Sequence, residues 1–274
     1  MPQIDPIPKR QLLSFKVRGP ELAATFTELR VSGPLTYAQI SERFAPPPEP
    51  RNDELLREGL EMLRVLELIW RIQPDEGSDS LYQVSEEVAA DVPFPLLLLG
   101  KLRAVNDDRR VFRLIHDLVI GEDLMFVTRH DLLTRLESVY PQIEYAWNVE
   151  KVRTWRAMAE YLGLTRSVKP SGGDILVSPI PDLLTQLLLA YASHAGILAD
   201  GKFDISLREW LEFVEANYCR CYAERLSVHQ GLARALLSMA AEKRIRLTML
   251  SDAGSVRLRD RAASHIELAL VPVQ

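Results

Sequence analysis

The residues best able to do chemistry in this sequence are cations that gather at two places, and the chemistry they offer is attraction to phosphate. One group lies between positions 151 and 169, and the other between positions 243 and 261. Lysine binds phosphate as a point charge, and arginine binds it through a planar head with several donors. We predict twelve nucleic-acid contacts, which include a threonine and a tyrosine that accompany the cations. They are Lys151, Arg153, Thr154, Arg156, Tyr161, Arg166, Lys169, Lys243, Arg244, Arg246, Arg257 and Arg259.

Residues for catalysis or metal binding form no recognisable set. The sequence lacks the phosphate-cradling G-x-x-x-x-G-K-[ST], the dinucleotide-binding G-x-G-x-x-G and the nucleophile turn G-x-S-x-G. The triplet His-Asp-Leu occurs twice, at His116 and at His130. Neighbouring residues on a helix point about 100° apart, so one triplet cannot chelate a single ion. We expect no catalytic residue, no metal and no cofactor, and an enzyme of unrecognised type is a third alternative to the two functions weighed below.

Charge limits any contact with nucleic acid to local patches. The 274 residues carry a formal net charge of −5, with 47% hydrophobic and 26% charged residues. Residues 1–95 hold ten Lys and Arg against sixteen Asp and Glu, residues 96–180 hold twelve against eleven, and residues 181–274 hold eleven against eleven. A protein that holds nucleic acid across its whole surface is normally basic. The N-terminal third is therefore the least suited to this contact.

Targeting signals are absent from the sequence as it stands. No apolar run is long enough to span a bilayer, and the N-terminus has prolines and charges where a signal peptide needs a long apolar segment. We expect a cytoplasmic protein without membrane contact. The pair Cys219 and Cys221 lies in a helix predicted over residues 207–226, where side chains two apart diverge, so we expect reduced thiols.

One local pattern must position the first group of cations. The stretch from Glu144 to Ser178 reads as an amphipathic helix, a strand over 164–168, a polar turn with Gly172 and Gly173, and a second strand over 175–178. The same order of helix, strand, polar turn and strand recurs before and after it, at intervals of about 90 residues. The last copy predicts a hairpin over 245–259, and the apolar ending HIELALVPVQ is expected to add a third strand there or to pair with another chain.

On these residues the chain resembles the winged helix-turn-helix superfamily. PLTYAQISERF lies where such domains have their second helix, and RNDELLREGLEMLRVLELI lies where they have their third. The intervening APPPEP is longer than the usual turn. The expected fold is mainly α with small β-hairpin wings, an α+β class, in three consecutive winged-helix-like units. We expect an extended arm over 1–20, an acidic unit over 21–92, and further units over 93–180 and 181–274.

The resemblance implies a non-enzymatic DNA-binding or DNA-associated protein. Winged helices commonly insert the third helix into the major groove of duplex DNA while the wing reaches the backbone. Cations suit this role in the second and third units, as in a regulator or an accessory subunit of a DNA-processing or defence-type assembly. The third helix of the first unit carries mainly acidic residues, so that unit is expected to bind a protein partner or to self-associate. The alternative function is a protein-only adaptor whose winged helices mediate subunit assembly.

Overall fold

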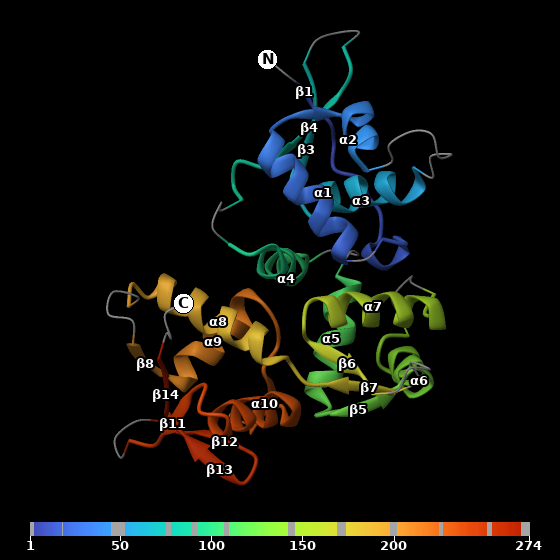
Figure 1. Ribbon diagram of the computed structural model, residues 1–274. Coiled ribbons are helices and arrows are strands. Elements are labelled where there is room, and N and C mark those ends of the chain that lie inside the picture. The colour runs from blue at the N-terminus through green and yellow to red at the C-terminus, as the bar shows by residue number, and fades with distance from the viewer. Residues whose placement is uncertain are drawn as a thin grey trace. The chain divides into compact units, whose positions relative to one another are not determined.

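The computed structural model describes residues 3–17, 19–44, 53–74, 78–88, 92–106, 110–141, 146–168, 174–197, 202–224, 227–250 and 254–269. The chain divides into two compact units, residues 1–112 and residues 113–274. Both combine helices with small, mainly antiparallel sheets (Figure 1). The predicted α+β class is therefore confirmed. Within the described ranges no helix is long and apolar enough to cross a membrane.

The first compact unit combines a helical core with a small sheet. Its elements are β1 (Gln3–Ile4), η1 (Leu12–Ser14), α1 (Gly19–Ser32), β2 (Leu35–Thr36), α2 (Tyr37–Phe44), α3 (Glu54–Val65), β3 (Ile69–Gln73), β4 (Leu81–Val84) and α4 (Phe94–Ala104). The sheet has the order β1-β3-β4-β2. Helix α1 buries Leu22, Phe26 and Leu29, and the Phe26 ring lies 5.0 Å from that of Phe94. Thr36 caps α2 by accepting a hydrogen bond from the Gln39 backbone N–H at 3.3 Å.

The N-terminal segment packs onto this unit. Strand β1 pairs with β3, and Leu12, Leu13, Phe15 and Val17 are buried. Burial of four apolar side chains contributes several kcal/mol, at roughly 1.5–3 kcal/mol for each. The prolines keep much of this segment extended, but its apolar residues belong to the core of the first unit.

The second compact unit begins with a helix, strand, helix, helix, strand, strand arrangement. These elements are α5 (Val111–Gly121), β5 (Phe126–Thr128), α6 (Arg129–Val139), α7 (Val149–Tyr161), β6 (Thr165–Ser167) and β7 (Asp174–Val177). The first strand pairs with the last, giving the order β5-β7-β6. Asn148 caps α7 by accepting a hydrogen bond from the Lys151 N–H at 2.9 Å, so this helix begins five residues after the predicted Glu144. The predicted hairpin after it is confirmed.

The remaining residues repeat that arrangement with two insertions. The repeated elements are α8 (Pro181–His194), β8 (Lys202–Ser206), α9 (Leu207–Asn217), α10 (Gln230–Ala241), β11 (Arg246–Thr248) and β14 (His265–Ala269). Again the first strand pairs with the last, in the order β11-β14-β8. The inserted strands are β9 (Tyr222–Glu224), β10 (Ser227–Val228), β12 (Val256–Leu258) and β13 (Arg261–Ala263). They form a separate sheet of order β13-β12-β10-β9, in which β10 and β12 are parallel.

Two predictions in this region are wrong. The helix predicted over 207–226 ends at Asn217, and the Cys219 N–H donates to the Val214 carbonyl at 3.0 Å. Cys221 then leads into β9, whose backbone groups pair with β10. The hairpin predicted over 245–259 does not form, because β11 pairs with β14 while β12 pairs with β13 and β10. The strand expected from HIELALVPVQ forms over His265–Ala269, but it lies between β11 and β8 instead of joining the predicted hairpin.

Candidate nucleic-acid interface

Helix α7 separates a buried face from an outward face that carries cations. Val152, Trp155, Met158 and Ala159 are buried. On the other face the Arg153 side chain is 59% exposed, and its Nη1 lies 3.8 Å from the Glu150 carboxylate, which is itself 76% exposed. Such an exposed pair is weak and exchanges readily with other ions. The guanidinium of Arg153 is therefore accessible to an anion.

The other residues predicted around α7 differ in their accessibility. Arg166 is exposed on β6, whereas Thr154 and Arg156 are half-buried. The Lys151 ammonium donates to the Ala146 carbonyl at 2.6 Å, and burial lowers the pKa of Lys151. We use the name α7 surface for four residues of α7 and one of the adjoining strand β6. They are Lys151, Arg153, Thr154, Arg156 and Arg166.

Tyr161 and Lys169 complete the set that the sequence places here. Tyr161 is half-buried, and burial raises the pKa of its phenol. Its ring therefore offers less area for stacking on a base than an exposed ring would. Lys169 lies outside the described residues.

Helix α3, the corresponding helix of the first compact unit, is partly covered by the chain itself. Arg10 donates to Glu58 at 2.8 Å and to Glu61 at 2.9 Å. Lys16 donates its ammonium to Glu54 at 2.6 Å and its backbone N–H to Glu58 at 2.5 Å. Three acids of this helix, Glu54, Glu58 and Glu61, are thus paired with the N-terminal segment. Glu54, Leu55 and Arg57 remain exposed on its outward face.

Helix α10, the corresponding helix of the last repeat, has a buried face and an outward face with one cation. It buries Leu232, Ala235, Leu236 and Met239, and it packs against α8 and β12. Its sequence contributes one cation, Arg234, and no acid. Arg234, Ser238 and Ala241 remain exposed on its outward face, so the cations of this repeat lie mainly outside the helix.

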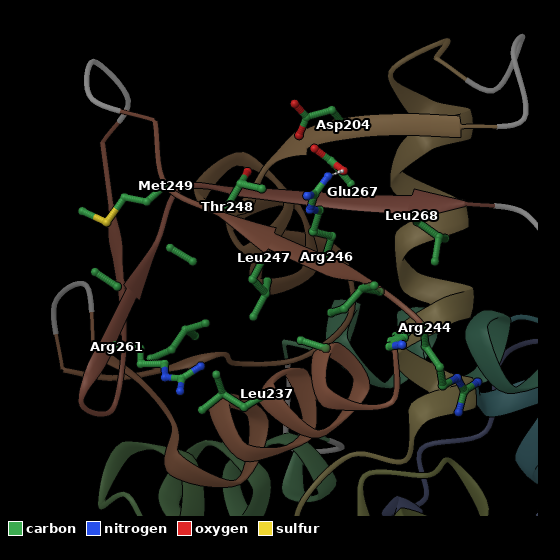
Figure 2. Close-up of a pocket in the computed structure, with 16 residues that line it drawn as sticks. Asp204, Leu237, Arg244, Arg246, Leu247, Thr248, Met249, Arg261, Glu267 and Leu268 are labelled. Carbon is green, nitrogen blue, oxygen red and sulfur yellow. Dashed lines mark hydrogen bonds and ion pairs between the residues drawn. The ribbon is translucent and has the colours of Figure 1, made fainter.

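A basic groove lies between α10, β11 and the hairpin of β12 and β13 (Figure 2). Its volume is about 1000 Å³. The predicted contacts Lys243, Arg244 and Arg246 are exposed at its margin. Arg244 Nη2 lies 3.1 Å from the Asp182 carboxylate, and Arg246 Nη1 lies 3.5 Å from Glu267. Four cations and two acids line this volume, which leaves it positive.

The two other predicted cations lie on the hairpin of β12 and β13. Arg257 is exposed on β12, and Arg259 is exposed in the turn with a positive φ of 58°. Arg259 follows β12 and Arg244 precedes β11, so neither lies within a strand. The sequence missed that Leu237 of α10 and Leu268 of β14 line the same groove as Arg246. No local pattern indicates this shared groove, because the strands that line it pair with strands far along the chain.

A small internal cavity holds two of the histidines of this chain. Its volume is about 30 Å³, and its lining includes His116, Cys219, Cys221 and His229. The His229 Nδ1 accepts from the Gly231 N–H at 3.2 Å, and Nε2 lies 3.2 Å from the Leu124 carbonyl. Burial lowers the pKa of His229 to about 4. In the part of the chain that the structure describes, no three His, Cys, Asp or Glu side chains are grouped as metal ligands.

Comparison with known proteins assigns no family. No protein-family model matches the chain, and no curated protein matches it. Among solved structures, the chain is similar to one described as the magnesium ion-bound SspB crystal structure. The TM-score is 0.37 and the identity 12%, over 95% of this chain and 86% of that chain. A similarity this weak carries no argument about fold or function.

Proposed function

We propose that the protein is a non-enzymatic DNA-binding protein whose main contact is the α7 surface. The observation that carries this proposal is the outward face of α7, where Arg153 is accessible and Arg166 lies on the adjoining hairpin. Helices α3 and α10 hold the equivalent place in their repeats, but α3 carries more acids than cations and α10 carries one cation. Within the described residues, α7 is the third helix best able to enter a major groove.

The connectivity supports a winged-helix interpretation of the three repeats. In each of them a helix and a strand precede two helices and two further strands, and the first strand pairs with the last. Winged-helix domains place the third helix in the major groove and the wing against the backbone. In this interpretation α7 reads the groove, and the hairpin of β6 and β7 reaches the phosphates.

The cations of the last repeat supply a second, sequence-independent contact in this proposal. Arg257 and Arg259 project from the hairpin of β12 and β13, and Lys243 follows α10. Phosphate contacts fix register and orientation but carry no base information. Sequence preference is therefore expected to depend on α7, while the last repeat adds affinity.

Binding to duplex DNA at two salt concentrations tests the proposal. The full chain should bind a labelled duplex in fluorescence anisotropy at low salt and lose affinity as salt rises, since phosphate contacts release counterions. Arg153→Glu combined with Arg166→Glu should weaken binding tenfold or more. A matched control, Arg30→Glu combined with Arg110→Glu, makes the same charge change at two exposed arginines elsewhere. Absence of binding at low salt, or equal loss in both double variants, would refute DNA binding through α7.

The protein-only adaptor is the second candidate, and exposed apolar side chains favour it. Met249, which lines the basic groove, and the adjacent Leu250 are exposed at 63% and 49%. Exposed apolar side chains that cluster are typical of protein interfaces. Wild-type protein that binds no duplex at low salt, while forming a defined complex with another protein, would favour this function.

A further inference from the structure

The basic groove has a strand edge along one wall. Strand β11 pairs with β14 on one side, and among the described residues no strand pairs with its other side. The residues of β11 line the groove (Figure 2). An edge strand presents backbone N–H and C=O groups at the spacing that another strand requires. The groove can therefore receive an extended chain through backbone hydrogen bonds.

The walls of the groove are apolar where side chains of an added strand would enter. Leu247 of β11 and Leu237 of α10 point toward one another across it, and Leu258 of β12 lines it too (Figure 2). At one end Met249 is 63% exposed. Side chains alternate between the two faces of a strand, so every second side chain of an added strand would meet these apolar residues.

The margin of the groove is charged and selects for an acidic occupant. The lining of the groove contains two acids, Asp204 and Glu267. It contains four cations, which are Lys243, Arg244, Arg246 and Arg261. Within the described residues Lys243 and Arg261 have no ion-pair partner. The described lining contains no aromatic ring on which a base of single-stranded nucleic acid would stack. Acidic side chains and apolar side chains in alternation match both features of the groove.

We propose that this groove binds an extended acidic segment of a partner protein, which adds to β11 as a further strand. Its apolar side chains pack against Leu237 and Leu247, and its carboxylates pair with Lys243 and Arg261. Strand addition gives affinity through main-chain hydrogen bonds and specificity through alternate side chains. The site is independent of the α7 surface and of whether that surface binds DNA.

A synthetic peptide tests strand addition directly. The probe is a labelled, end-capped hexapeptide of alternating glutamate and valine, added to the full chain in fluorescence anisotropy. Saturable binding is expected, and amide exchange should slow in residues 246–248. Methylation of alternate backbone nitrogens removes the strand hydrogen bonds and should weaken binding at least tenfold. Replacement of each glutamate by lysine should abolish binding.

Charge reversals locate the peptide in the groove. Lys243→Glu combined with Arg261→Glu should weaken binding at least tenfold, whereas Arg257→Glu combined with Arg259→Glu on the hairpin should change it less than twofold. No saturable binding of the probe, or binding that N-methylation leaves unchanged, overturns the proposal. An oligothymidylate that binds with the same dependence on Lys243 and Arg261, where the peptide does not bind, assigns the groove to nucleic acid instead. If a variant unfolds, the N-methylated probe still decides the question on the unaltered protein.

Discussion

The carbonyl oxygen of Val177 lies where a β-carbon on Gly231 would stand. That carbon would be 1.9 Å from the oxygen, so strand β7 and the first turn of α10 approach as closely as a glycine allows. The Ser178 hydroxyl donates to the Gly231 carbonyl at 3.1 Å in the same buried place. Because the nearest obstacle, the Val177 carbonyl group, belongs to the backbone, Gly231→Ala should destabilise the protein by about 3 kcal/mol or more. Urea unfolding followed by circular dichroism measures this loss.

The matched control for this substitution is Gly121→Ala. There the added carbon would meet the terminal Nη1 of Arg220 at 2.7 Å, and a flexible side chain can move away. The loss of stability should be clearly smaller than at Gly231. Similar losses at both positions would mean that the contact between β7 and α10 is not the constraint.

Acid should destabilise the protein through His229. Its pKa falls from 6.5 to about 4 because the ring is buried, with its Nδ1 accepting from the Gly231 N–H. The unfolded chain therefore binds a proton more readily than the folded protein between these two values. Stability from this group is complete above about pH 6.5 and falls by about 3 kcal/mol as the pH drops to about 4.

Comparison of wild type with His229→Asn isolates this contribution. Asparagine can still cap α10 but does not titrate. Unfolding free energies of both proteins, measured between pH 7 and pH 4, should converge as the pH falls. Parallel curves would show that His229 is not responsible for the acid sensitivity.

Removal of the Glu58 carboxylate should loosen the N-terminal segment. Its side chain is only 11% exposed, and it accepts from Arg10 at 2.8 Å and from the Lys16 N–H at 2.5 Å. Glu58→Ala leaves both donors without this acceptor and should cost about 2 kcal/mol. Glu54→Ala, which removes an exposed partner of Lys16, should leave the melting temperature unchanged. Faster proteolysis of residues 1–17 in the Glu58 variant alone would confirm the order of these effects.

Salt dependence should report the number of phosphates that α7 contacts. If Arg153 and Arg166 each neutralise one phosphate, the double reversal to glutamate should reduce the slope of log affinity against log salt by roughly 2. Titrations at four or more salt concentrations give this slope. An unchanged slope with weaker binding would indicate that the two arginines act through protein structure and not through phosphate.

Local patterns predicted the elements whose partners lie close in sequence. The hairpin after α7 is correct because its strands are joined by a short polar turn in the sequence. Trp155 and Trp210, which stand among apolar neighbours in the sequence, are fully buried. In these places periodicity and tertiary packing specify the same structure.

The predictions are wrong where strands pair with partners far along the sequence, because no local pattern indicates such pairing. The helix predicted through Cys221 has no glycine or proline after Asn217 to end it, and pairing between β9 and β10 decides the boundary. Likewise β11 reads as half of a hairpin, yet its partner β14 follows an inserted pair of strands. Each cation was proposed as a nucleic-acid contact from its place in the sequence. The groove that these cations border depends on the strand pairings, so it could not be predicted. The pairing of Arg10 and Lys16 with acids of α3 was not predicted, because these partners also lie far apart in the sequence.

The position of β14 between β8 and β11 has a consequence for how this sheet assembles. Residues 202–206 and 246–248 are made before residues 265–269, and each pairs with that last strand and not with the other. Until the last strand enters, both neighbours present unpaired edges, and such edges recruit strands from other molecules. Crowding during synthesis or refolding is therefore most harmful to this sheet, and a chaperone that shields strand edges would benefit it more than the local hairpin of β6 and β7.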